Sequence, residues 1–368
     1  MKIERAEAIS VRIPLRFPFE TSYGRQTERE SILVRVHSKD GDGWGEAAVS
    51  EYPDYCYETP EVGMLALSKY ILPHVVGKEF ATPEELSHEL STICGYPFVK
   101  TGVETAFIDM YTKALGVPIH QWLGGERPYI TPGISLGIED DFGLLTERID
   151  WALEKGYARI KLKIKRGRDV SVVSAVRENF GGIHMMVDAN CAYTLDDLDR
   201  LKALDGYGLM MIEQPLSADD LADHADLQRR INTHICLDES IRGIADLRAA
   251  VALGACRVIN IKYGRIGGLV AAKRLASACI RHGIAVWCGG MLETGIGRAH
   301  NLALNSLMEF SLPGDISASD RYWDEPIIDP PVEMEEGRIE LPEGPGIGFT
   351  VLEDKVKKFT TASIEIKS

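Results

Sequence analysis

The chain has 368 residues, 45% of them hydrophobic and 26% charged, which is typical of a globular protein of two domains and not of a disordered chain. Its formal net charge of −14 argues against nucleic acid or an anionic membrane surface as a partner. No run approaches the roughly 20 apolar residues of a membrane span, and the N-terminus lacks a signal-type apolar core, so we expect a cytoplasmic protein. Its seven cysteines form no CxxC pair and indicate reduced thiols.

The first 128 residues predict an α+β domain. Residues 1–50 contain alternating apolar and polar residues, and the turn KDGDG joins two of the expected strands as a hairpin. The loop Phe19–Arg25 is polar and carries aromatic residues, which suits a lid better than a core. Residues 60–117 carry apolar residues at helical spacing. We therefore expect a strand-then-helix domain that ends near residue 128.

A regular spacing of charged residues follows. Five of them recur at intervals of 25, 25, 25 and 24 residues: Lys163, Asp188, Glu213, Asp238 and Lys262. Each closes a short apolar run, and helix-patterned segments lie between the runs. A strand plus its crossover helix takes roughly 25 residues, so we predict a βα repeat with one ionisable residue at the C-terminal end of each strand. In a (β/α)8 barrel these ends meet at one mouth, where such enzymes place their chemistry.

We predict an α/β fold in which a modified (β/α)8 TIM barrel over residues 129–320 carries the α+β capping domain over residues 1–128. The first barrel strand is expected over residues 130–138 and the eighth over residues 308–315. The proline-rich tail 321–368 breaks the repeat and is expected to return to the capping domain.

Alternation along the strands indicates which side chains face the pocket. Residues i and i+2 share one face of a strand, so Lys161 and Lys163 point the same way. Parallel strands are usually near-continuous apolar runs. Two inward lysines on one strand are costly unless the site uses their charge.

The three carboxylates Asp188, Glu213 and Asp238 suit a hard cation that prefers oxygen ligands, such as Mg²⁺. Without a cation they would repel one another. The alternative is that each carboxylate caps its own loop, but residue type, strand position and spacing coincide three times.

Two lysines near such a metal indicate proton transfer. A cation and Lys161 nearby would favour the neutral amine of Lys163, the form that accepts a proton. Lys262 comes from the sixth strand, across the barrel, and would reach the opposite face of a planar substrate. This arrangement fits removal of a proton α to a carboxylate, with the enediolate stabilised by the metal.

The motifs KLK (161–163), VDAN (187–190), IEQP (212–215), LDES (237–240), INIK (259–262) and GRIGGL (264–269) resemble those of the enolase superfamily, in its muconate-lactonizing-enzyme subgroup. Longer stretches, among them WCGGMLETGIGRAHN (287–301) and LPGDISASDRYW (312–323), are similar to the N-succinylamino acid racemase / o-succinylbenzoate synthase family. The resemblance covers nearly the whole chain.

This resemblance implies a Mg²⁺ enzyme, with Mn²⁺ or Co²⁺ as substitutes, in which Lys163 and Lys262 work on opposite faces of the substrate and Lys161 assists. Ser135, Asn190, Gly290 and Met291 match substrate-pocket positions. Arg265 follows Lys262 by three residues, at a position where the racemisation-competent members of the family resemble this sequence. Tyr23 lies in the loop that matches the family's capping loop.

The reaction implied is dehydration to o-succinylbenzoate in menaquinone synthesis, N-succinylamino acid racemisation, or both. Dipeptide epimerases of the subgroup carry Asp-x-Asp where this chain reads Asp315-Ile316-Ser317, which counts against that specificity. A proline is common in the family where Tyr263 stands. A cycloisomerase, another epimerase and a non-catalytic protein of the same fold remain the alternatives. We expect a small carboxylate as substrate and a homo-oligomer.

Three further signals carry less weight. GRIGGL is interpreted as a tight strand-to-helix turn and not as a dinucleotide site. TGIGR (294–298) suits either a helix entry or phosphate capture. His224 is expected to serve in packing or at the surface and not as an acid or base.

Overall fold

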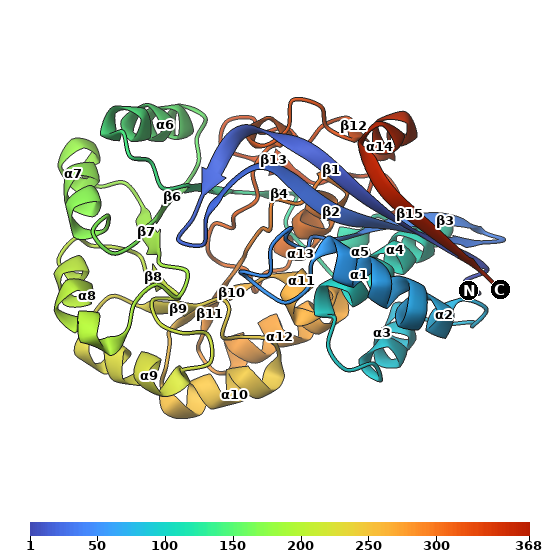
Figure 1. Cartoon of the computed structure of the whole chain (residues 1–368), viewed down its shortest axis with the longest axis horizontal. Coiled ribbons are helices and arrows are strands. Elements are labelled where there is room, and N and C mark those ends of the chain that lie inside the picture. The colour runs from blue at the N-terminus through green and yellow to red at the C-terminus, as the bar shows by residue number, and fades with distance from the viewer.

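The computed structural model describes residues 1–368. The chain is organised around two large sheets, one antiparallel and one parallel. An antiparallel sheet has the strand order β15-β1-β2-β3, and a parallel sheet has the order β11-β10-β9-β8-β7-β6-β5 (Figure 1). The antiparallel strands are β1 (Arg5–Glu20), β2 (Arg25–Ser38), β3 (Gly41–Ala47) and β15 (Thr360–Lys367). The parallel strands are β5 (Gly133–Leu136), β6 (Arg159–Lys163), β7 (Met185–Asp188), β8 (Ile212–Glu213), β9 (Ile235–Leu237), β10 (Val258–Ile261) and β11 (Ala285–Cys288).

The antiparallel sheet is covered on one face by helices. The longest of them, α4, packs directly on β3, where two glycines of that strand allow close approach. A Cβ atom on Gly43 would lie 2.2 Å from Ala106 O, and one on Gly45 would lie 2.2 Å from Gly102 O. The helices of this part are α1 (Pro60–Ala66), a π-helical turn over Leu67–Ile71, α2 (Leu72–Val75), α3 (Pro83–Ser91), α4 (Pro97–Leu115) and α5 (Ile119–Leu123).

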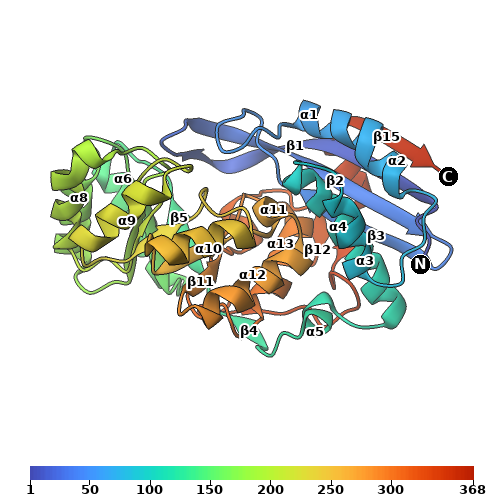
Figure 2. The same ribbon diagram turned by 90° about the horizontal axis from the view of Figure 1, so that it is seen from below.

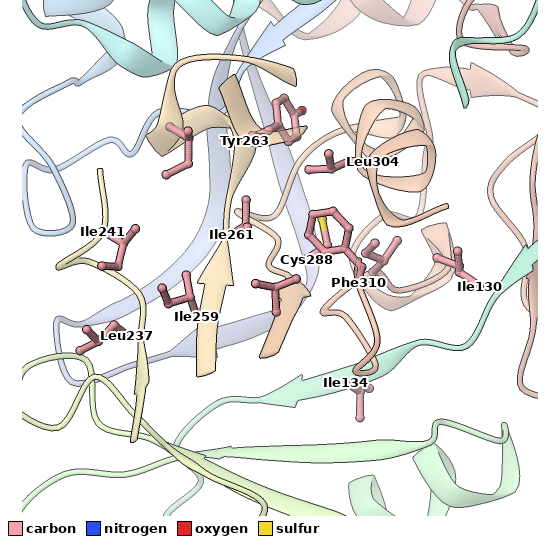
Figure 3. Close-up of a cluster of buried hydrophobic side chains, with 14 of the residues drawn as sticks. Ile130, Ile134, Leu237, Ile241, Ile259, Ile261, Tyr263, Cys288, Leu304 and Phe310 are labelled. Atoms are coloured by element: carbon pink, nitrogen blue, oxygen red, sulfur yellow. The ribbon is translucent and has the colours of Figure 1, made fainter. Parts of the chain in front are cut away.

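The parallel sheet curls into a half-barrel with its helices outside. Apolar strand residues such as Ile259 and Ile261 pack outward against the helices, within one continuous hydrophobic core (Figure 3). The helices are α6 (Phe142–Glu154), α7 (Val170–Phe180), α8 (Leu198–Asp205), α9 (Leu221–Arg230), α10 (Ile244–Leu253), α11 (Tyr263–Ile266), α12 (Leu269–Arg281) and α13 (Gly295–Asn305). The predicted fold class is confirmed: an antiparallel capping sheet joined to a parallel, curled α/β barrel.

The predicted eighth strand, over residues 308–315, is wrong. Phe310 forms only an isolated parallel bridge with Val286 of β11. Further along, Asp315 N donates to Cys288 O at 2.9 Å, and Gly133 N of β5 donates to Gly314 O at 2.7 Å. Pro313 has no backbone N–H group to donate to the hydrogen-bond ladder of a sheet, which disfavours a regular strand here. An irregular segment therefore connects the two edges of the seven-stranded sheet.

Two buried carboxylates of the capping sheet and its helix α4 lie at the N-termini of barrel helices. Glu46 of β3 accepts hydrogen bonds from Thr294 N at 3.0 Å and Gly297 N at 2.9 Å, at the start of α13. Glu104 of α4 accepts one from Leu269 N at 2.6 Å, at the start of α12. The N–H groups and the dipole at these helix starts partly offset the cost of burying the two carboxylates. These contacts hold the two sheets together side by side (Figure 2).

The C-terminal segment runs back along the molecule. Strand β13 (Ile339–Glu340) pairs with β4 (Tyr129–Ile130), β12 (Ile328–Asp329) pairs with β14 (Thr350–Val351), and α14 (Glu353–Phe359) leads into β15. Since β15 pairs with β1, the two termini lie close together (Figure 1), and Ser368 N donates to Glu4 O at 3.1 Å. The domain bounds of residues 1–128 and 129–320 stay a prediction. No helix of the chain combines the length and apolar character that crossing a membrane requires.

Candidate active site

The register of three adjacent strands places Lys163, Asp188 and Glu213 in one row. Lys163 of β6 pairs with Asp188 of β7, and Asp188 pairs with Glu213 of β8. Lys163 Nζ donates to Asp188 Oδ2 at 2.7 Å and to Asn190 Oδ1 at 2.8 Å. Lys161 Nζ lies 3.3 Å from the same oxygen of Asp188, so both lysines point to one side of β6 as alternation predicts.

Lys161 is buried among acidic groups. Its Nζ lies 2.5 Å from Asp315 Oδ2 and 3.0 Å from Glu213 Oε2. The second oxygen of Asp315 accepts from Arg159 Nη1 at 2.8 Å. Although burial opposes it, Asp315 and Glu213 hold the pKa of Lys161 well above its usual value. Lys161 is therefore a fixed cation in this arrangement.

Lys262 follows β10 and lies on the other side of the mouth. Its Nζ donates to Asp238 Oδ2 at 2.8 Å, and it lies 4.4 Å from the centroid of the Tyr55 ring. Arg265 donates to the other oxygen of Asp238 and, at 2.7 Å, to the Tyr55 hydroxyl. Although burial opposes the charged form, Asp238 and then Tyr55 raise the pKa of Lys262.

The three carboxylates are fully buried, and their surroundings shift their pKa values in different directions. Although burial alone would raise the pKa of Asp188, Lys163 and Lys161 hold it below the usual range. Burial, reinforced by the Asp188 carboxylate, raises the pKa of Glu213 to about 8. Crowded negative charge of this kind is what a bound divalent cation relieves.

The carboxylates fit a divalent cation in donor type, in burial and in their position at the ends of adjacent strands. In this conformation no group of three histidine, cysteine or acidic side chains has the arrangement of a metal cluster. Lysine ammonium groups instead bind the oxygens of Asp188, Glu213 and Asp238. Binding of a cation here therefore requires the carboxylates to exchange lysine contacts for the metal.

The tip of the β1–β2 hairpin lies over the mouth. Tyr23 Oη donates to Glu239 Oε1 at 3.2 Å, and Ser22 Oγ donates to Asn190 O at 3.3 Å. Asn190 Nδ2 donates to the same oxygen of Glu239 at 3.2 Å. Burial, and next the Asp238 carboxylate, raise the pKa of Glu239 to about 7. Both views show this hairpin extending from the capping sheet over the barrel (Figures 1 and 2).

A cavity of about 270 Å³ lies between the hairpin and the strand ends. Most of the predicted site residues line it: Tyr23, Ser135, Lys161, Lys163, Asn190, Lys262, Gly290 and Met291. Four predicted residues do not line it: Asp188, Glu213, Asp238 and Arg265. These four are buried and bonded to the lysines or to one another. Basic side chains outnumber acidic ones in the cavity lining, a setting suited to an anionic ligand.

Comparisons with known proteins agree with this geometry. Residues 4–124 match the mandelate racemase / muconate lactonizing enzyme N-terminal domain, and residues 145–355 match the enolase C-terminal domain-like family. An o-succinylbenzoate synthase of Geobacillus stearothermophilus is 48% identical over 95% of this chain and 94% of that protein. An N-succinylamino acid racemase of Thermus thermophilus is 45% identical over 95% of this chain and 94% of that protein.

The chain belongs to the o-succinylbenzoate synthase / N-succinylamino acid racemase family of the enolase superfamily.

Solved structures of the superfamily share the fold. A superfamily member from Listeria innocua is 39% identical, with a TM-score of 0.96 over 100% of this chain and 99% of that one. A muconate lactonizing enzyme of Pseudomonas fluorescens, solved with muconolactone, is 26% identical, with a TM-score of 0.93 over 98% and 99% of the two chains.

One position where this chain departs from the family pattern is accommodated by packing. Tyr263, the position at which a departure from the family pattern was expected, is buried, and its hydroxyl donates to Gly297 O at 3.1 Å. The GRIGGL segment lies between β10 and α12 as predicted, but its first three residues belong to the short helix α11, and the turn itself consists of Gly267 and Gly268 at positive φ. The sequence TGIGR is a helix entry, because Thr294 caps α13. His224 is a packing residue: its Nδ1 lies 2.6 Å from Asp220 O, and its Nε2 accepts from Leu216 N.

Three polar residues of the site were missed by the sequence analysis: Tyr55, Glu239 and Arg159. The alternation that selected Lys161 and Lys163 could also have found Arg159, two residues earlier on β6. Glu239 directly follows Asp238 in the sequence, so its place beside a predicted site residue could have indicated it. Tyr55 lies in the irregular segment between β3 and α1, and no periodic pattern leads to it.

Proposed function

We propose that this protein abstracts the proton α to the carboxylate of a small substrate and catalyses o-succinylbenzoate formation by dehydration, N-succinylamino acid racemisation, or both. The observation that carries this is the placement of Lys163 and Lys262. They reach one cavity from β6 and β10, with three buried carboxylates beneath them. The synthase and racemase relatives named above support the two reactions.

Members of the enolase superfamily typically use a divalent metal ion. For this chain we infer Mg²⁺, held by Asp188, Glu213 and Asp238. When bound, the cation would offset the negative charge that develops on the substrate carboxylate as the α-proton leaves. Mn²⁺ and Co²⁺, which accept the same ligands, are the expected substitutes.

For racemisation, each lysine serves one face of the substrate. The neutral amine of Lys163 takes the α-proton from its face, and the ammonium of Lys262 returns a proton to the opposite face, which inverts the centre. The reverse reaction exchanges the two roles. Both groups are already within the same cavity, so the transfers need no large movement.

For dehydration, one lysine does the proton transfers. Lys163 takes the α-proton and then gives it to the departing hydroxyl group on the same face. Lys262 remains an ammonium and stabilises the enediolate, a role that suits the raised pKa it has beside Asp238.

Substrate contacts follow from the cavity lining. Ser135, Asn190 and the backbone of Gly290 offer polar groups, and Met291 and Tyr23 offer apolar surface. Arg265 acts from behind Lys262, through Asp238, and not by touching the substrate. Asp315 is already bound to Lys161 and Arg159, so it is not free to hold the ammonium group of a dipeptide.

The test uses purified protein with Mg²⁺ and four substrate classes: the hydroxylated precursor of o-succinylbenzoate, N-succinyl amino acids, dipeptides and lactones. Absorbance follows the aromatic product, and polarimetry follows racemisation. We expect turnover of the first, the second, or both, and a Lys163→Ala, Lys262→Ala double variant is the control for a contaminating enzyme. Turnover confined to dipeptides or lactones, or none at all, would contradict the proposal.

A further inference from the structure

Tyr55 of the capping domain contacts Lys262 directly. The ring of Tyr55 lies 4.4 Å from Lys262 Nζ, a distance at which the electron-rich face of the ring attracts the ammonium group. The hydroxyl of Tyr55 donates to Asp238 Oδ1 at 3.1 Å and accepts from Arg265 Nη1 at 2.7 Å. The Tyr55 ring and the Asp238 carboxylate therefore hold the same ammonium.

Tyr23 reaches Lys163 by a different route. Its hydroxyl donates to Glu239 Oε1, which also accepts from Asn190 Nδ2, both at 3.2 Å. The amide oxygen of Asn190 then accepts from Lys163 Nζ at 2.8 Å. The Asn190 side chain is thus bonded at both ends, its amide nitrogen to Glu239 and its amide oxygen to Lys163.

The two routes begin on separate segments of the capping domain. Tyr23 lies in the turn between β1 and β2, and Tyr55 lies in the segment between β3 and α1. Both tyrosines line the cavity, together with both lysines. The first route ends at Lys163 and the second at Lys262.

We propose that Tyr23 and Tyr55 are positioning residues that orient the two lysines independently, Tyr23 for Lys163 and Tyr55 for Lys262. This inference rests on the proposed function, since it assigns each tyrosine to one face of the substrate. It means that the capping domain sets the efficiency of each proton transfer separately, in addition to closing the mouth.

Removal of one tyrosine should therefore slow proton transfer at one face of the substrate more than at the other. A misplacement of about 1 Å at a reacting group costs up to roughly 100-fold in rate. Tyr55→Leu removes both the ring and the hydroxyl, whereas Tyr55→Phe keeps the ring over Lys262. We expect a loss of about tenfold or more for the leucine variant and a smaller loss for the phenylalanine variant.

The first experiment measures α-proton exchange in D₂O for each enantiomer of an N-succinyl amino acid, with kcat and KM determined separately. Lys163→Arg and Lys262→Arg establish which enantiomer depends on which lysine. Tyr55→Leu should lower kcat mainly for the Lys262-dependent enantiomer, and Tyr23→Phe mainly for the Lys163-dependent one. Equal losses for both enantiomers in both variants would overturn the proposal.

The second experiment does not need an active enzyme. Wild type and variants are treated with an amine-modifying reagent, and the rate of labelling of each lysine is measured by peptide mass spectrometry. Tyr55→Leu should raise labelling of Lys262 several-fold and leave Lys163 unchanged, with Tyr55→Phe close to wild type. Unchanged labelling of Lys262, or an equal rise at both lysines, would overturn the inference.

Tyr57→Leu is the matched control in both experiments. Tyr57 lies two residues from Tyr55 on the same segment, but its hydroxyl accepts from Tyr96 N at 2.8 Å within the capping domain. Labelling and exchange should match wild type in this variant. If wild type exchanges no α-proton, the proposed function fails, while the labelling rates still decide whether Tyr55 positions Lys262.

Discussion

The strand ends of the barrel and the loops of the capping domain hold their functional groups in different ways. On the barrel, Lys161, Lys163 and Lys262 each lie within 3.0 Å of a buried carboxylate oxygen. The hydroxyl groups of Ser22, Tyr23 and Tyr55 on the capping loops donate longer hydrogen bonds to the barrel, at 3.1–3.4 Å. The barrel is therefore suited to carry the chemistry, and the capping loops are suited to place the lysines and to shape the substrate pocket.

The largest expected effects lie on the barrel side of this comparison. Replacement of Lys163 or Lys262 by alanine should lower kcat for racemisation by about 10²–10⁴-fold, because a positioned acid or base contributes that much. Steady-state kinetics with N-succinyl amino acids gives the measurement. A loss below tenfold for either variant would mean that the two lysines do not share the proton transfers.

Metal binding should depend on pH through Glu213. Burial and the Asp188 carboxylate raise the pKa of Glu213 to about 8, so this carboxyl group must lose a proton before it can bind a cation. Mg²⁺ affinity should therefore rise by up to roughly tenfold per pH unit below pH 8 and level off above it. Calorimetric titration at several pH values measures this. An affinity that is constant from pH 6 to pH 9 would contradict either the raised pKa of Glu213 or its role as a ligand.

A smaller effect is expected where the capping domain docks on the barrel. Glu46→Ala leaves the N–H groups of Thr294 and Gly297 without their partner, which should lower the free energy of unfolding by about 2–3 kcal/mol. The segment before α13 carries Gly290 and Met291, so KM should rise more than kcat falls. Denaturant unfolding and steady-state kinetics test both, with Glu340→Ala, an exposed carboxylate of β13, as control.

The smallest expected effect is a change in how stability depends on pH. Burial raises the pKa of Glu104 to about 7, above the value of about 4.3 expected in the unfolded chain. The folded state thus binds more protons between these values, and stability falls as pH rises from about 4.5 to 7. Glu104→Gln should flatten this fall by about 1–3 °C in Tm between pH 5 and pH 8. An unchanged slope would show that Glu104 is already ionised below this range.

The regular parts of the site could be predicted from the sequence because each charged residue closes a strand. The 25-residue spacing and the alternation along β6 identified Lys161 and Lys163, and the structure shows both on one side of that strand, beside Asp188. The eighth strand could not be predicted correctly. Its apolar residues suggested a strand, but the segment with Pro313 forms only isolated hydrogen-bonded contacts with β11 and β5 and no continuous ladder.

The contacts made by the capping domain could not be predicted from the sequence, for a different reason. The hydrogen bond between Tyr55 and Asp238 joins residues 183 positions apart, and that between Tyr23 and Glu239 spans 216. No local pattern encodes such pairs, because they depend on how the capping sheet docks on the barrel. Arg159 is the exception among the missed residues, since it continues the alternation of Lys161 and Lys163.

Exchange of the α-proton of an N-succinyl amino acid, followed by proton NMR in D₂O with Mg²⁺ present, tests the central claim most directly. Exchange reports the abstraction step alone, whichever overall reaction the protein catalyses. We predict that wild type exchanges the α-proton of both enantiomers and that the Lys163→Ala, Lys262→Ala double variant exchanges neither. Absence of exchange by the wild-type protein, with Mg²⁺ shown by calorimetry to be bound, would contradict this account.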